Sequence, residues 1–356
     1  MGASAVVQED LERIVSSGLP WQALHQRVVL ISGAGGFLPA YMVETLLHLG
    51  ASQGIEVTVV GLVRNAETAR ARLGHHRNLH LVEGDVAAIR KSELPHADII
   101  IHAASQASPK YYGKDPVGTL AANTLGTATL LGHAADCRSS AFLFLSSGEV
   151  YGEVPESKIP TGEQDYGYLD PLSVRACYAE SKRMGENMCV SWHHQYGVDT
   201  RIVRPFHTYG PGMRMDDGRV YADFVRAVLN GEDLLLNSDG SARRAFCYLS
   251  DAVSGFFHVL FRGKPASAYN IGNPAGECSI LELAETVAGL SPGKKLQVRA
   301  NQCAPEAGYI PSPISRNVPR IDAARALGWL PAIGIREGFS RTLRHYALAS
   351  ETGDSA

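Results

Sequence analysis

A strand pattern that runs directly into a glycine turn and then a helix constrains this chain more than any other feature. The apolar segment Val28–Ser32 is followed by Gly33-Ala34-Gly35-Gly36, and a helical pattern continues from Tyr41 to Leu49. Glycine lets the main chain turn tightly after a strand, and the N-terminus of the next helix attracts anions. The segment therefore predicts a strand-turn-helix unit that binds the pyrophosphate of a dinucleotide.

Apolar segments of strand length recur and alternate with helical segments. We expect strands at 28–32, 57–63, 79–83, 99–102, 142–146 and 200–204. This alternation predicts an α/β fold with a doubly wound parallel sheet of the Rossmann type. After Pro211 the pattern changes to loops, short helices and isolated strands such as 267–271, which we interpret as a smaller mixed α/β C-terminal lobe that binds the substrate.

The same pattern suggests domain boundaries. Residues 1–26 form an N-terminal extension with a short helix at Glu9–Ser16, in which Trp21 and Leu24 can pack on the body. Residues 27–205, with later returning segments, form the nucleotide-binding domain. Residues 206–346 form mainly the substrate-binding lobe, and 347–356 form a polar tail that we expect to be mobile.

Composition narrows the class of protein. The chain has 356 residues, 45% hydrophobic and 19% charged, which is enough to bury a sizeable core. Its net charge of -3 gives no basic field for nucleic acid or an anionic membrane. Neither a signal-peptide pattern nor an apolar run of membrane-spanning length is present. The six cysteines are scattered and form no Cys/His cluster, so we expect reduced thiols, no metal site and a cytoplasmic location.

Two short motifs indicate chemistry at an alcohol. Tyr178 and Lys182 are four positions apart, so on a helix the ammonium lies near the phenol and favours phenolate. A phenol that normally titrates near pH ~10 can then accept a proton from an alcohol as hydride leaves. About thirty residues upstream, the predicted strand at 141–145 ends in Ser146, Ser147 and Glu149, where parallel sheets place ligands. Alone, a tyrosine and a lysine at this spacing are more often a surface helix pair.

With these motifs the chain resembles the extended short-chain dehydrogenase/reductase family of NAD-dependent nucleotide-sugar epimerases, dehydratases and decarboxylases. Within that family it looks most like UDP-glucuronate decarboxylases. The resemblance runs from about Arg27 to Tyr346. The stretches that carry it are His102–Tyr112, Arg175–Arg183, Arg204–Pro211, Asp217–Val220, Arg243–Phe246 and Ala326–Pro331.

The resemblance implies a set of dinucleotide-binding residues. They are Gly33, Gly36, Phe37, Leu38, Arg64, Asp85, Val86, Ala103, Ala104, Asn123, Tyr178 and Lys182. Pro39 stands where the family has a third glycine, at an early helical position that tolerates proline. NAD-preferring members usually end the second strand with an acidic residue, whereas this chain has Arg64. We expect bound NAD, with NADP as the alternative because Arg64 could hold a 2′-phosphate.

The resemblance also implies catalytic roles. Tyr178 would accept the proton of the sugar C4 hydroxyl, Lys182 would tune it, and Ser147 would share the hydrogen bond. Glu149 would help to select the second step. Dehydratases have an Asp-Glu pair at 148–149 and decarboxylases usually have Ser-Glu, whereas this chain has Gly148-Glu149. We predict decarboxylation of an NDP-hexuronate; a 4-epimerase, then a 4,6-dehydratase, are alternatives, and a non-catalytic nucleotide sensor is an alternative of another class.

The remaining assignments concern substrate and partner. The resemblance implies sugar or diphosphate contacts from Tyr112, Arg175, His207, Arg219, Arg244 and Arg316. Relatives usually have asparagine in place of His207, which indicates a different sugar or base from UDP-glucuronate. A homodimer is expected through two helices at about 115–135 and 178–196, where Met184, Met188 and Trp192 suit either a dimer face or the core.

Overall fold

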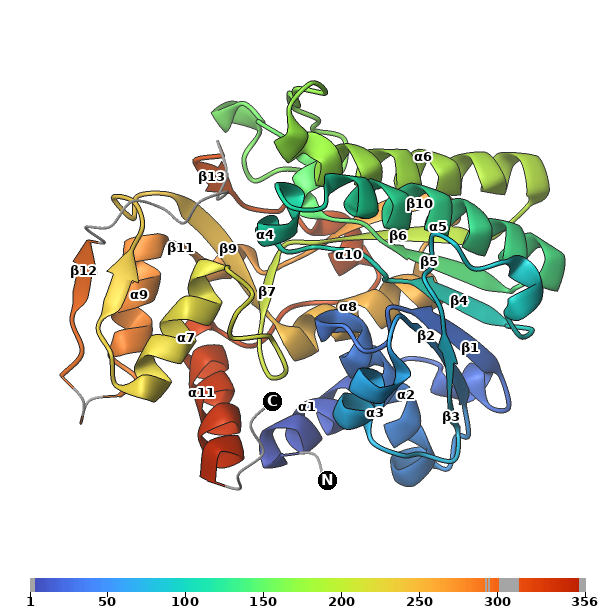
Figure 1. The fold of residues 1–356 in the computed structure, drawn as a ribbon, viewed down its shortest axis with the longest axis horizontal. Helices are drawn as coiled ribbons and strands as arrows, with labels where there is room; N and C mark the ends of the chain where they lie inside the picture. Colours follow the sequence, from blue (N-terminus) through green and yellow to red (C-terminus); the bar gives the residue numbers. More distant parts are fainter. Residues whose placement is uncertain (1–3, 292, 294, 301–313, 352–356) are drawn as a thin grey trace.

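The computed structural model of the protein describes residues 4–291, 293, 295–300 and 314–351, and Figure 1 shows the arrangement of its elements. The helices are α1 (Ala5–Val15), α2 (Phe37–Gln53), α3 (Ala66–Leu73), α4 (Pro109–Tyr112), α5 (Pro116–Cys137), α6 (Cys177–Tyr196), α7 (Val220–Asn230), α8 (Leu249–Arg262), α9 (Ile280–Ala288), α10 (Asp322–Ala326) and α11 (Ile335–Glu351). The strands are β1 (Val28–Ser32), β2 (Thr58–Val63), β3 (Leu79–Glu83), β4 (Ile99–His102), β5 (Ala141–Leu145), β6 (Thr200–Pro205), β7 (His207–Tyr209), β8 (Leu234–Leu236), β9 (Arg243–Tyr248), β10 (Ser267–Ile271), β11 (Glu277–Ser279), β12 (Val298–Ala300) and β13 (Arg316–Asn317).

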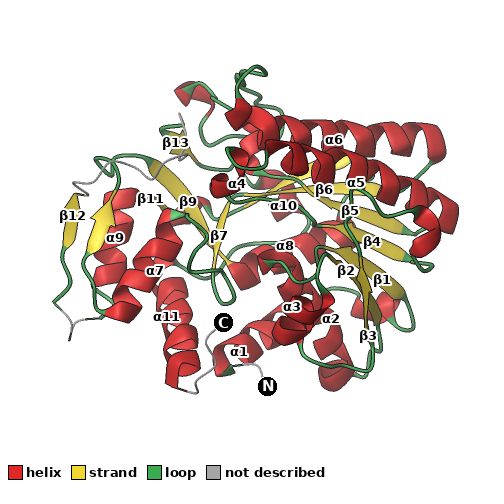
Figure 2. Ribbon diagram, viewed as in Figure 1, coloured by secondary structure: helices red, strands yellow, loops and turns green. Residues whose placement is uncertain are grey.

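Seven strands form one parallel sheet in the order β10-β6-β5-β4-β1-β2-β3. The strand order reverses between the neighbouring strands β1 and β4, and doubly wound sheets bind ligands at such a switch point. The predicted Rossmann-type sheet is thus confirmed. One prediction was wrong: we placed 267–271 in the C-terminal lobe, whereas β10 pairs with β6 at the edge of the large sheet (Figure 2). Local pattern could not reveal this, because the pairing joins segments over sixty residues apart.

Helices cover both faces of this sheet. Leu30, Ile100 and Phe142 point into the core beneath α5 and α6, whereas Ile31 and Ile101 point into the core shared with α1, α2 and α8. Both faces of the central strands are therefore buried, which explains why they appear in the sequence as continuous apolar runs rather than alternating ones.

The remaining strands and helices form a smaller mixed unit, at the left of Figure 1. In it, β9 pairs in parallel with β7 and β13 and antiparallel with β11, and β8 pairs with β12. A second core lies among α7, α9 and α11 and includes Tyr209, Phe224, Leu283 and Phe339. Strand β7 follows β6 after a single residue, so the chain passes directly from the large sheet into this unit.

The N-terminal extension packs on the body as predicted, but its helix begins earlier. Helix α1 spans Ala5–Val15 rather than Glu9–Ser16, because Ser4 caps it: its hydroxyl accepts a hydrogen bond from the Val7 amide at 3.4 Å. Trp21 and Leu24 are both buried. At the other terminus α11 continues to Glu351, and the rest of the predicted tail lies outside the described residues.

Two further features concern the helices and the cysteines. In the part of the chain that the structure describes, no helix combines the length and apolar character needed to cross a bilayer. The five cysteines within that part are free thiols, and Cys303 lies outside it.

Candidate functional site

A cavity of about 950 Å³ opens at the carboxyl ends of the parallel strands, between the large sheet and the smaller unit. It brings together most of the side chains that the sequence singled out. The predicted residues that line it are Gly33, Gly36, Phe37, Leu38, Arg64, Asp85, Val86, Ala103, Ala104, Tyr112, Ser147, Glu149, Arg175, Tyr178, Lys182, His207, Arg219 and Arg244. Asn123 and Arg316 are not among its lining residues.

The glycine turn forms one end of the cavity and leaves no room for a side chain at Gly33. Gly33 has φ +69°, and a Cβ there would lie 2.7 Å from the Cα of Ala104. The Ser32 hydroxyl accepts hydrogen bonds from the amides of Ala103 and Ala104, both at 3.1 Å, which holds the ends of β1 and β4 together. Gly36 caps α2 without a side-chain bond, so the first amides of α2 can bind an anion. These residues fit a dinucleotide pyrophosphate.

The end of β2 carries no carboxylate. Arg64 is exposed at the cavity wall, and the next residue, Asn65, caps α3 by accepting a hydrogen bond from the Thr68 amide at 2.7 Å. Asp85 follows β3 and is also exposed, and its carboxylate accepts the amide of Ala87 at 2.8 Å. The side chains available at the ends of β2 and β3 to recognise a ribose or an adenine are therefore the guanidinium of Arg64 and the carboxylate of Asp85.

Tyr178 and Lys182 lie in the first turns of α6, and both are buried. The ammonium of Lys182 donates a hydrogen bond to the main-chain oxygen of Leu145 at 2.6 Å and lies 5.8 Å from the centre of the Tyr178 ring. Burial lowers the pKa of Lys182 to about 7, and the Glu186 carboxylate opposes this.

We expected Lys182 to bring the pKa of Tyr178 toward neutrality, and the structure differs. Burial raises the pKa of Tyr178 to about 12. A hydrogen bond with the Ser147 side chain and the charges of Arg219 and Arg175 oppose the rise, whereas Glu149 adds to it. Both groups of the pair are buried, and burial favours the neutral form of each, so the phenol is not brought toward neutrality.

Glu149 is held by an arginine. The Arg175 guanidinium lies 3.3 Å from the Glu149 carboxylate and 4.9 Å from the centre of the Tyr112 ring. Tyr112 in turn stacks on Tyr178, with ring centres 5.2 Å apart and planes inclined by 16°. One carboxylate, one guanidinium and two phenols thus line the same part of the cavity.

Another part of the cavity wall carries three basic side chains, those of His207, Arg219 and Arg244. His207 is half-buried, its Nδ1 has no hydrogen-bond partner, and burial together with Arg244 and Arg219 lowers its pKa to about 3. Arg219 pairs with Asp217, its Nε donating at 2.6 Å. Arg244 donates to main-chain oxygens, among them that of Ile314 at 2.6 Å. The imidazole is neutral between two guanidinium groups, and this region attracts anions.

Two predicted residues lie elsewhere. Arg316 donates two hydrogen bonds to Glu277, at 2.8 and 3.0 Å, away from the cavity. Asn123 is buried on α5 and donates to the hydroxyl of Ser181, the residue before Lys182, at 3.0 Å. It therefore contacts α6 without lining the cavity.

Similarity to known proteins defines the family. The sequence model of the NAD dependent epimerase/dehydratase family matches residues 29–272, which include every strand of the large sheet except the first residue of β1. The chain belongs to this family. Arg64, Pro39 and Gly148 are therefore departures within a known family rather than evidence for another fold.

Curated members of this NAD dependent epimerase/dehydratase family are similar over most of the chain. A UDP-glucuronic acid decarboxylase of Arabidopsis thaliana is 36% identical over 312 residues, covering 87% of this chain and 86% of that protein. One from Danio rerio is 37% identical over 328 residues, covering 91% of this chain and 73% of that protein.

Solved structures agree on the fold. A dTDP-glucose 4,6-dehydratase from Streptomyces venezuelae, with NAD bound, has a TM-score of 0.76 at 27% identity and covers 91% of this chain and 98% of its own. A UDP-glucuronic acid 4-epimerase from Bacillus cereus, in complex with NAD, has a TM-score of 0.76 at 22% identity and covers 89% and 98%.

Sequence reasoning missed a buried network beside the end of β5 and α6. The Ser146 hydroxyl donates to Glu186 at 2.5 Å, and Arg204 binds both oxygens of Glu186, at 2.8 and 2.6 Å. The signal was present: Glu186 follows Lys182 by four residues and Tyr178 by eight, so all three share a helix face.

Among the described residues no group of three or more potential metal ligands is found.

Proposed function

We propose that the protein is an NAD-dependent nucleotide-sugar enzyme that oxidises its substrate at C4 and decarboxylates an NDP-hexuronate. The observation that carries the proposal is the single cavity in which Ser147, Tyr178 and Lys182 adjoin the Glu149–Arg175 pair. Similarity to UDP-glucuronic acid decarboxylases over 87% of the chain supports this reaction over the others of the family.

NAD is the proposed cofactor. The turn at Gly33 and Gly36 and the N-terminus of α2 would hold its pyrophosphate, and the ends of β2 and β3 would hold its adenosine. The oxidised nicotinamide supplies a hydride acceptor and a positive charge. Arg64 also suits the 2′-phosphate of NADP, and the mass of the dinucleotide released on denaturing the purified protein distinguishes the two.

In the first step Tyr178 accepts the proton of the C4 hydroxyl while the C4 hydrogen leaves as hydride. The pKa of Tyr178, about 12 when buried, must fall for this to occur near neutral pH. Ser147, Arg175 and Arg219 already oppose the rise, and a cation bound beside the phenol acts in the same direction. The product is a 4-keto sugar.

In the second step the 4-ketone makes a C5 carboxylate a β-keto acid. The C5–carboxyl bond breaks, carbon dioxide leaves, and the electron pair forms an enolate at C4 and C5. C5 is then protonated and hydride returns to C4, so the cofactor ends as it began. We propose that Glu149, held by Arg175, orients the substrate's carboxyl group and transfers the proton to C5.

A 4-epimerase is the second candidate, and Gly148 favours it. That residue supplies no hydroxyl where decarboxylases usually have serine, and no acid where dehydratases have aspartate.

The proposed substrate contacts are Tyr112, Arg175, His207, Arg219 and Arg244. Arg316 is engaged by Glu277, so its role would be to brace the unit that carries Arg244, which is on the adjacent strand.

The proposal is tested by incubating the purified protein with UDP-glucuronate and measuring the molecular mass of the product by mass spectrometry. Loss of the mass of carbon dioxide supports the decarboxylase, and UDP-galacturonate of unchanged mass supports the epimerase. Absence of turnover with any of a panel of UDP- and dTDP-hexoses and hexuronates would contradict an enzymatic function and favour a nucleotide sensor.

We also propose a homodimer and the division into domains at residues 26, 205 and 346. Exposed apolar side chains on α5 and α6, among them Val117, Leu125 and Met184, support a dimer face, whereas Met188 and Trp192 are partly buried against the core. Light scattering at micromolar concentration tests it: twice the chain mass of 38.2 kDa is expected.

A further inference from the structure

Helix α1 lies outside the segment that the family model matches and fills a space between α2, α8 and α11. Its apolar residues Val7, Leu11 and Ile14 join the core shared with α2 and α8. Within this buried face stands a carboxylate, Asp10, with no exposed surface. A fully buried acid is costly unless it is paired, so its partners show what the helix binds.

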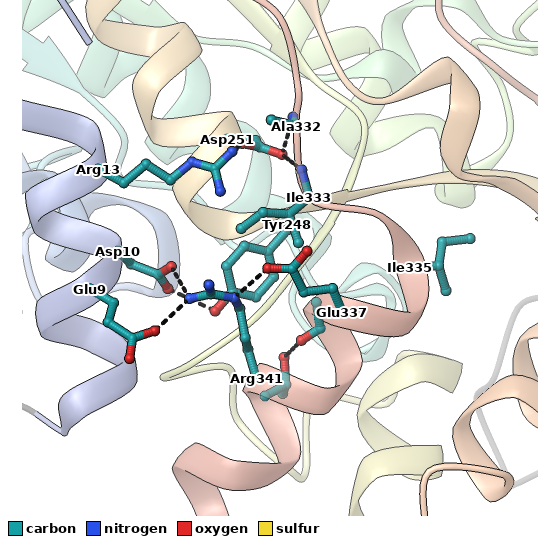
Figure 3. Close-up of polar contacts among 12 residues, drawn as sticks. Glu9, Asp10, Arg13, Tyr248, Asp251, Ala332, Ile333, Ile335, Glu337 and Arg341 are labelled. Carbon is teal, nitrogen blue, oxygen red and sulfur yellow. Dashed lines mark hydrogen bonds and ion pairs between the residues drawn. The ribbon is translucent and has the colours of Figure 1, made fainter. Parts of the chain in front are cut away.

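Asp10 is bonded to three different elements. Its carboxylate accepts the hydroxyl of Tyr41 on α2 at 2.8 Å and that of Tyr248 at the end of β9 at 2.7 Å. The Arg341 guanidinium on α11 lies 3.4 Å from its other oxygen. Figure 3 shows Arg341 between the acids of α1 and Glu337, with Tyr248 beside them. Burial raises the pKa of Asp10, and these three donors oppose the rise.

Both tyrosines are on elements that contribute lining residues to the cavity. Tyr41 follows Phe37, a lining residue, by one helical turn on α2, whose N-terminus is the proposed pyrophosphate site. Tyr248 ends β9, the strand that carries the lining residues Arg244 and Phe246 and pairs with the His207 strand. One carboxylate therefore joins the wall formed by α2 to the wall formed by β7 and β9.

A second set of bonds holds α1 in place. Arg13 lies 3.4 Å from Asp251 on α8, and the other oxygen of Asp251 accepts the amides of Ala332 and Ile333, both at 2.8 Å (Figure 3). Arg341 also contacts Glu9 at 3.1 Å. Helix α1 is thus tied on one side to α8 and on the other to α11, and it cannot shift without breaking a buried contact.

We propose that Asp10 is a positioning residue: through Tyr41 and Tyr248, helix α1 clamps α2 to β9 behind the cavity and sets the distance between its two walls. The roles given to the two walls, binding the dinucleotide and binding the substrate, rest on the proposed function. The link through Asp10 is independent of that function, because it is defined by hydrogen bonds alone.

Hydrogen exchange tests the clamp without any ligand. Asp10→Asn removes the charge, and Tyr41→Phe and Tyr248→Phe each remove one hydroxyl without leaving a void. Glu12→Gln is the matched control, because Glu12 also links α1 to α2, through His48 at 2.8 Å, but at the surface. Well below the unfolding temperature, Asp10→Asn should speed amide exchange about fivefold or more in both 37–43 and 243–248, roughly the effect of losing one hydrogen bond.

Exchange that stays within about twofold of wild type in either segment, or that rises equally in Glu12→Gln, overturns the proposal. If Asp10→Asn does not fold, the two tyrosine variants decide by the same criterion. With UDP-glucuronate the folded variants should lose kcat while the Kd for NAD, measured by fluorescence, changes less than about threefold. A wild-type protein that turns over no nucleotide sugar would refute the proposed function and leave the exchange result standing.

Discussion

The guanidinium of Arg175 holds the carboxylate of Glu149 at 3.3 Å, inside the cavity that contains Tyr178. We propose that this pair takes part in the second half of the reaction. This contact orients the Glu149 carboxyl group within the cavity, where we propose that it transfers the proton at C5.

Replacing Glu149 should therefore separate the two half-reactions. In Glu149→Gln we expect carbon dioxide release from UDP-glucuronate to fall by about 10²-fold or more, the usual effect of losing a general acid or base. The keto-sugar and reduced cofactor should accumulate, which absorbance detects. Glu153→Gln, an exposed glutamate four residues away, serves as the control and should keep the wild-type rate. Equal rates in both variants would remove Glu149 from the mechanism.

Tyr178→Phe should abolish the first step and leave the fold unchanged. The substitution retains the ring that stacks on Tyr112 but removes the phenolic oxygen that is hydrogen-bonded to Ser147, so we expect a loss of about 10³-fold in cofactor reduction. Tyr196→Phe alters an exposed tyrosine on the same helix and is the control. A Tyr178→Phe enzyme within tenfold of wild type would contradict the assigned role.

Gly33→Ala should prevent dinucleotide binding. The new Cβ would meet the Ala104 Cα at 2.7 Å, in a backbone with φ +69°. Gly54→Ala separates the two effects, because Gly54 has φ +67° with open space around it. It should cost only the backbone strain, about 1 kcal/mol, and keep full NAD affinity. Titration of NAD into both variants checks this, and equal affinities would show that the turn tolerates a side chain.

Acid should destabilise the protein through His102, which is buried, and His207, which is half-buried. The pKa values of His102 and His207 are both lowered from 6.5 to about 3, chiefly by burial. Between these values the unfolded chain binds more protons, so stability falls as pH decreases through this window, by up to about 1.4 kcal/mol per pH unit for each histidine. His207→Gln should make the slope of urea stability against pH shallower between pH ~6 and ~4. An unchanged slope would mean that His207 is protonated in the folded state.

The sequence predicted local features well and long-range ones poorly. The glycine turn, the strand ends at His102 and Ser146 and the pair on α6 were found because each obeys a short-range rule of spacing or backbone geometry. The pairing of β10 with β6, the engagement of Arg316 by Glu277 and the clamp at Asp10 all depend on contacts between distant segments. The pKa of Tyr178 was misjudged for a related reason: spacing shows which charge is near, whereas burial depends on the whole fold.

The central claim is decarboxylation of a nucleotide hexuronate by this cavity, and isotopic labelling tests it most directly. Purified protein is incubated with UDP-glucuronate labelled at the carboxyl carbon, without added reductant. The label is then measured in the released carbon dioxide and in the nucleotide product. We predict labelled carbon dioxide and an unlabelled UDP-pentose in equal amounts, and neither in Tyr178→Phe. Retention of the label in UDP-galacturonate would contradict the account.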